Sequence, residues 1–161
     1  MRKQVAYFGV LTALALIFSY VEHLIPIQFG IPGIKLGLAN VMVLIVLYKM
    51  GGKEAMLLSV IRVVLSGFMF GNLFAILYSM AGGILSFLVM YLLKRTTWFS
   101  LIGVSMAGGV FHNMGQLLIA GIVVESFSVF YYLPILVFAG ILTGILIGFL
   151  ANEMLKRLRK I

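Results

Sequence analysis

Residues 33–72 read GIKLGLANVMVLIVLYKMGGKEAMLLSVIRVVLSGFMFGN, and this stretch decides the fold. It contains two hydrophobic segments joined by a short basic turn at residues 49–53. Each segment holds a polar residue, Asn40 in the first and Arg62 in the middle of the second. An arginine at membrane depth costs about 2.5–3.5 kcal/mol on insertion scales unless it faces protein, water or an anion. Arg62 is therefore either an internal tie between helices or the centre of a binding site.

The composition of the whole chain is that of a membrane protein. Of its 161 residues, 63% are hydrophobic and only 10% are charged, and the mean hydropathy is +1.21. A soluble domain carries about 25% charged residues. We therefore expect residues 1–161 to form a single membrane domain in a multi-pass protein of the cell (cytoplasmic) membrane.

Residues that the sequence lacks exclude several kinds of chemistry. It has no cysteine, which excludes disulfide bonds and thiolate sites. It has no aspartate, and its two histidines, His23 and His112, lie far apart in the sequence. We therefore predict no metal site, no cofactor and no catalytic residues. The net charge of +8 is concentrated at the ends of the hydrophobic segments, which indicates membrane topology and not nucleic-acid binding.

The apolar runs divide the chain into six segments, judged against the roughly 20 residues that a helix needs to cross the hydrocarbon core. The second segment is short, and the stretch before it, IPIQFGIPGIK at 25–35, predicts a re-entrant loop or an interfacial connector. The expected fold is an all-α bundle of six transmembrane helices. We expect these helices at about 5–24, 36–48, 55–70, 73–93, 101–124 and 131–150.

The distribution of basic residues predicts the orientation of this bundle. Six spans place both termini on one side, together with nearly all lysines and arginines, whereas the opposite side holds Lys35 alone. Cytoplasmic loops carry the excess of Lys and Arg, so we expect both termini to be cytoplasmic. The residues on that side are Arg2, Lys3, Lys49, Lys53, Lys94, Arg95, Lys156, Arg157, Arg159 and Lys160.

Polar residues in the middle and outer half of the spans define a candidate pocket that opens outward. Arg62 would form its floor, and its ligand would be anionic or polar because the only deep charge is positive. No acidic residue is expected deep enough to neutralise Arg62, since Glu54 lies two turns below it and Glu22 and Glu125 lie near the outer surface. The alternative is that these side chains only tie helices together, in bonds worth about 0.6 kcal/mol each. The candidate substrate-binding residues are Lys35, Asn40, Arg62, Asn72, His112, Asn113 and Gln116.

Small residues at a spacing of four predict two faces for close helix packing or for coupling to a partner. Gly9 and Ala13 form one face on the first segment. Gly140, Gly144 and Gly148 form a stronger one on the sixth segment.

Three stretches resemble one protein family, namely 33–48, 60–72 and 100–120, the last of which contains the motif VFHNMGQ. The family is named both heptaprenyl diphosphate synthase component I and Gx transporter, and the resemblance covers nearly the whole chain. This family is similar in turn to the substrate-binding S components of energy-coupling-factor vitamin transporters. Those are six-helix proteins with both termini inside, and they dock a coupling subunit through small residues on helix one, where Gly9 and Ala13 fall.

The resemblance implies two functions. The first, which we expect, is a substrate-binding component of an importer for an anionic or polar molecule that resembles a vitamin or a prenyl precursor. It would work with a coupling subunit and ATPases. The alternative is a non-catalytic membrane partner in heptaprenyl diphosphate or quinone biosynthesis, or in flavin-based electron transfer. Prenyl synthases bind magnesium diphosphate through aspartate-rich motifs, and this chain has no aspartate with which to build one.

Overall fold

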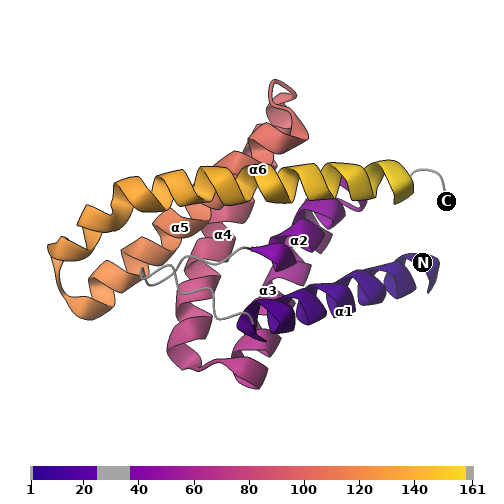
Figure 1. Cartoon of the computed structure of the whole chain (residues 1–161). Coiled ribbons are helices and arrows are strands. Elements are labelled where there is room, and N and C mark those ends of the chain that lie inside the picture. The colour runs from indigo at the N-terminus through magenta and orange to yellow at the C-terminus, as the bar shows by residue number, and fades with distance from the viewer. Residues whose placement is uncertain (1, 25–36, 159–161) are drawn as a thin grey trace.

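A computed structural model describes residues 2–24 and 37–158, without the side chains of residues 2 and 3 (Figure 1). The described residues form helices and no strands, which confirms the all-α expectation. The stretch 25–35, with Lys35, lies outside the described residues. The helices are α1 (Arg2–Leu24), α2 (Leu38–Lys49), α3 (Gly52–Phe70), α4 (Leu73–Thr96), α5 (Leu101–Val124), the 3-10 helix η1 (Phe127–Tyr132) and α6 (Leu133–Leu158).

Four helical stretches in the described part are long and apolar enough to cross a membrane. They are α1 from Gln4 onward, α4, α5, and η1 together with α6. The chain is therefore a multi-pass membrane protein. Helix α2 has only 12 residues, and α3 carries three charged residues, Lys53, Glu54 and Arg62. The count of six spans and the cytoplasmic position of the termini stay predictions.

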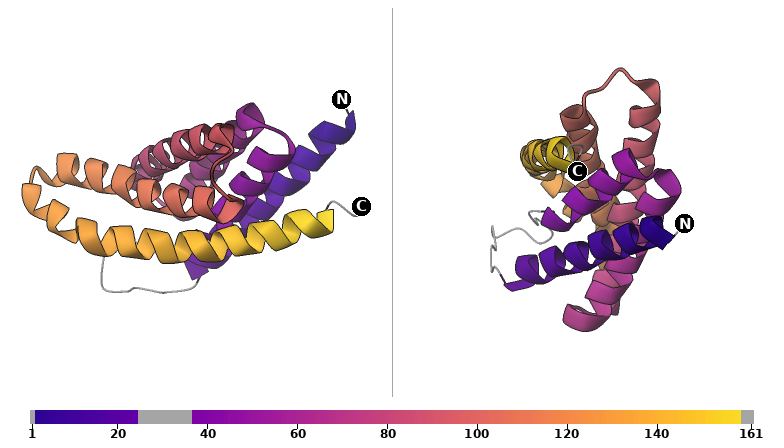
Figure 2. Two further views of the ribbon diagram at one scale, coloured as in Figure 1. Left: turned by 90° about the horizontal axis from the view of Figure 1, so that it is seen from above. Right: turned by 90° about the vertical axis from the view of Figure 1, so that its right-hand side faces the viewer.

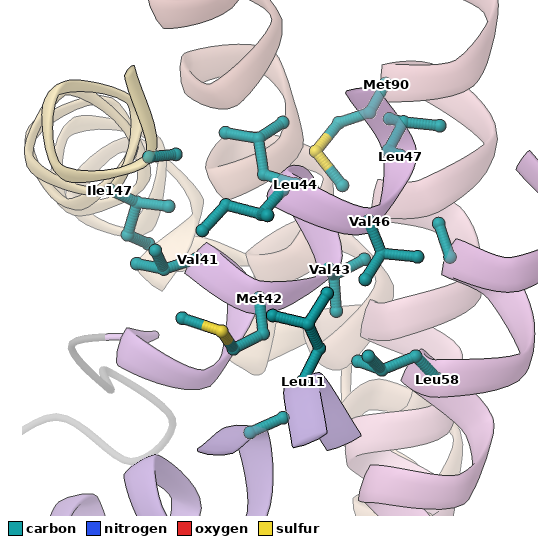
Figure 3. Close-up of a cluster of buried hydrophobic side chains, with 14 of the residues drawn as sticks. Leu11, Val41, Met42, Val43, Leu44, Val46, Leu47, Leu58, Met90 and Ile147 are labelled. Carbon is teal, nitrogen blue, oxygen red and sulfur yellow. The ribbon is translucent and has the colours of Figure 1, made fainter. Parts of the chain in front are cut away.

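Helix α2 lies at the centre of the hydrophobic core. Its residues 41–47 are all buried, and its sequence has no polar face. A helix that is apolar on every side is stable only when other helices surround it. Figure 3 shows its side chains among Leu11 of α1, Leu58 of α3, Met90 of α4 and Ile147 of α6. A helix enclosed in this way faces protein and not lipid, so it need not be long enough to span the bilayer.

Two lysines hold the carboxyl end of α2. Lys94 Nζ of α4 donates a hydrogen bond to the Leu47 carbonyl oxygen at 2.6 Å and lies 5.0 Å from the centre of the Tyr48 ring. Lys49 Nζ donates to the Leu158 carbonyl oxygen at 3.2 Å, near the end of α6. The last carbonyl groups of a helix carry partial negative charge, so ammonium groups stabilise this end.

Helices α5 and α6 run side by side as a long hairpin (Figure 2). Their contact is close because glycines face each other across it: a Cβ atom added at Gly109 would lie 2.3 Å from the Gly140 carbonyl oxygen. A Cβ added at Gly144 would lie 2.6 Å from Met106 Cα, and one added at Gly148 would lie 2.9 Å from Ile102 Cα. The glycine face of α6 is thus covered by α5 of the same chain.

The first turn of α1 and the last turn of α6 lie at the same end of the bundle (Figures 1 and 2). The bond from Lys49 to Leu158 places the end of α2 there as well. At the other end of the α5–α6 hairpin, Glu125 ends α5 in a left-handed conformation with φ 51°. The 3-10 helix η1 forms most of the connection between α5 and α6.

Candidate functional site

Arg62 lies inside the protein, at the first turn of α2. Its side chain is only 9% exposed, although it comes from the middle of α3. The Nη2 atom donates a hydrogen bond to Asn40 Oδ1 at 3.1 Å. The Arg62 Nε atom is buried and has no acceptor among the described residues. The structure therefore brings Asn40 and Arg62 together and leaves part of the guanidinium's donor capacity unused there.

Glu22 also reaches this place, at the start of α2. Its Oε1 atom accepts a hydrogen bond from the backbone N–H of Gly37, the residue that caps α2. The Glu22 and Arg62 side chains form no ion pair in the described part of the chain. Glu22 reaches the start of α2 because the last turn of α1 packs beside the first turn of α2.

Gly37 is required where α2 begins. Its φ is +73°, a left-handed conformation that side chains disfavour. A Cβ atom there would also lie 2.9 Å from Ile147 Cδ1 of α6. Sequence reasoning missed Gly37 and Glu22, although a glycine just before an apolar helix and a glutamate at the end of the preceding one were both visible in the sequence.

The polar residues of α5 contact the two neighbouring helices. Gln116 is 2% exposed and packs against Gly82 of α4. A Cβ atom added at Gly82 would lie 2.8 Å from Gln116 Cγ and 2.7 Å from the His112 carbonyl oxygen. Asn113 points the other way, and its Nδ2 donates to the Leu136 carbonyl oxygen of α6 at 2.8 Å. Gln116 and Asn113 thus lie in packing contacts of α5 with α4 and α6.

The remaining candidates lie on the surface of the described chain. Asn72 is exposed and caps α4, with its Oδ1 accepting from the Ala75 N–H at 2.8 Å. Gly9 and Ala13 are exposed on α1, and a Cβ at Gly9 would meet no atom within 4 Å. Within residues 2–24 and 37–158, no three His, Asp or Glu side chains gather as possible metal ligands. The candidate site is therefore the cluster of Glu22, Gly37, Asn40 and Arg62, which we call the α2 entrance cluster.

The sequence profile of the family described as heptaprenyl diphosphate synthase component I matches residues 11–154. The chain belongs to this family. The match begins in α1 and ends in α6, so it includes every residue of the α2 entrance cluster. A search of curated proteins and a search of solved structures found no match.

Membership in the heptaprenyl diphosphate synthase component I family favours the second of the two functions that the sequence implied. The family description names a component of a synthase and does not name a transporter. The chain has no aspartate with which to build the aspartate-rich motif that prenyl synthases use to bind magnesium diphosphate. The similarity to vitamin-transporter S components stays an expectation.

Proposed function

We propose that this chain is the non-catalytic membrane component of a prenyl diphosphate synthase, and that a separate subunit carries out the chemistry. The observation that carries the proposal is the family match, which extends from α1 into α6 of a multi-pass bundle. A membrane component suits this reaction for a physical reason. Each buried CH₂ group favours the bilayer by about 0.8 kcal/mol, so a long prenyl product belongs in the membrane where this chain lies.

The basic end of the bundle is the place where we expect a soluble subunit to dock. Exposed basic residues lie in the last turns of α2, α4 and α6, and another lies in the first turn of α3. With six spans and cytoplasmic termini, this end faces the cytoplasm. An acidic surface on the catalytic subunit would be steered towards it. The exposed basic residues are Lys49, Lys53, Arg95, Lys156 and Arg157.

The test is co-purification followed by an activity measurement. The tagged chain is expressed with the catalytic prenyl synthase subunit of the same cell, extracted in mild detergent and captured. We expect the catalytic subunit to be retained, and prenyl chain length or yield in proteoliposomes to depend on this chain. Reversing the charge at Lys156 and Arg157 should reduce retention, whereas Ser128→Glu, an exposed position beyond α5, should not. The proposal fails if the catalytic subunit is not retained and its products are the same without this chain.

A second candidate function is a binding component for a small anionic solute, working with a coupling subunit and ATPases. The observation that favours it is the burial of Arg62, whose Nε has no acceptor among the described residues. Native mass spectrometry of the gently purified protein tests it. A retained vitamin or other solute would support this function, and a protein that carries only lipid would remove it.

A further inference from the structure

The α2 entrance cluster combines two features that attract an oxyanion. The first turn of a helix presents N–H groups that have no acceptor within the helix, and the helix dipole adds partial positive charge there. In α2 one of these groups, the Asn40 N–H, already donates to the Gly37 carbonyl oxygen at 2.8 Å. Anions bind at such helix starts in many proteins. Arg62 adds a full positive charge at the same turn, through its bond to Asn40 Oδ1 at 3.1 Å. Because Arg62 is only 9% exposed, water screens this charge poorly.

Two further observations point to a ligand beyond the protein's own groups. The Arg62 Nε donor is buried without an acceptor in the described residues, which is costly for a charged group. In addition, the Glu22 carboxylate lies at the start of α2, on the N–H of Gly37. A carboxylate is itself an oxyanion, so Glu22 shows that this helix start accepts one. It does so without forming an ion pair with Arg62 in the described part of the chain.

We infer that the first turn of α2 and Arg62 form an oxyanion site that Glu22 occupies in this structure, and that a phosphate-bearing ligand binds by displacing the Glu22 carboxylate. This inference rests on the proposed function, because it assigns the phosphate or diphosphate group of a prenyl lipid in the bilayer to the site. The site lies at the end of the bundle opposite the basic docking end. A diphosphate carries more negative charge than a carboxylate, and its several oxygens suit the forked donors of a guanidinium, so it competes successfully with Glu22. Free inorganic diphosphate offers the same chemistry.

The inference predicts opposite effects for two substitutions in one site. Glu22→Gln removes the negative charge that opposes the ligand and retains an oxygen for the Gly37 N–H, so anion binding should become about five- to tenfold tighter. Arg62→Gln removes the positive charge, and binding should weaken by about tenfold or more, because hydrogen bonds to charged groups are among the strongest. The control is Glu125→Gln, which removes an exposed carboxylate at the end of α5 and should change affinity less than about twofold.

The experiment measures binding of radiolabelled farnesyl diphosphate to the full chain in lipid nanodiscs. Unlabelled inorganic diphosphate and farnesol serve as competitors. Competition by farnesyl diphosphate alone assigns a lipid-borne headgroup, and competition by inorganic diphosphate as well assigns a free anion site. Competition by farnesol equal to that by farnesyl diphosphate would overturn the inference, because the prenyl chain alone would then carry the binding.

Misfolding cannot imitate the expected result, because Glu22→Gln is predicted to gain affinity. The inference is overturned if the unaltered protein binds neither anion, or if Glu22→Gln and Arg62→Gln both bind as it does. This test uses the chain without any synthase subunit. The oxyanion site can therefore stand when no catalytic partner is retained, and the partner can be retained when no anion binds.

Discussion

The contact between Gly109 and Gly140 gives the sharpest prediction for stability. In Gly109→Ala, the new Cβ would lie 2.3 Å from the Gly140 carbonyl oxygen and 3.2 Å from its carbonyl carbon. The first distance is 1.1 Å short of the 3.4 Å at which ordinary van der Waals contact begins. Both neighbouring atoms belong to the backbone of α6, so no side chain can turn away to make room. Helices α5 and α6 must move apart along their hairpin.

The size of the effect follows from two opposing contributions. Overpacking a tight contact costs about 1–3 kcal/mol, and separating the helices also weakens the contacts at Gly144 and Gly148. Replacing glycine by alanine within a helix stabilises it by about 0.5–1 kcal/mol. Gly103→Ala on the same helix is the matched control, since its Cβ would come no nearer than 3.6 Å to any neighbouring atom.

The assay is thermal unfolding in detergent, followed by size-exclusion chromatography with fluorescence detection. In a chain of this length, 1 kcal/mol changes Tm by about 2–4 °C. We expect Gly109→Ala to melt about 2–12 °C below Gly103→Ala. Equal melting temperatures for the two variants would refute the reasoning, because the α5–α6 contact would then tolerate a methyl group that the structure has no room for.

Three more predictions use the same unfolding assay or a labelling assay. Asn113→Leu should lower the free energy of unfolding by about 0.6 kcal/mol, the average contribution of a hydrogen bond between membrane helices. A variant as stable as the parent would show that the bond to α6 contributes nothing. Lys94→Met should lower Tm more than Arg95→Met does, since only Lys94 bonds the carboxyl end of α2; the reverse order would contradict this. Because the chain has no cysteine, single cysteines at Lys156 and Phe127 can be labelled in intact cells with a membrane-impermeant maleimide. Labelling at 127 alone supports cytoplasmic termini, and labelling at 156 contradicts them.

The sequence predicts the helices well because the length and hydropathy of apolar runs identify membrane helices. The expected segment at 101–124 has the same limits as α5, and the segment expected at 131–150 continues as α6 to Leu158, because polar residues after the apolar run still favour helix. Helix α3 begins at Gly52, three residues earlier than expected, since Lys53 and Glu54 extend it beyond its apolar part.

The candidate site is only partly predictable, because hydropathy says nothing about which helices touch. The sequence interpretation assigns Asn40 and Arg62 to one pocket, and in the structure a hydrogen bond joins them. The position of Glu22 on the Gly37 N–H was not predicted, since it depends on how α1 approaches α2. Likewise, helical spacing places His112 and Gln116 on one face of their helix. It does not predict that Asn113 bonds α6, because that bond depends on how two helices cross.

The complete enclosure of α2 has a consequence for how the protein is made. At about 1.5 Å per residue, its 12 residues reach only about 18 Å, against a hydrocarbon core of about 30 Å. A nascent chain that ended at α2 could not leave it stably across the bilayer. The segment must therefore wait near the insertion machinery for later helices. One of its core neighbours, Ile147, is synthesised a hundred residues after Leu47, so the core around α2 is complete only after α6 has been synthesised.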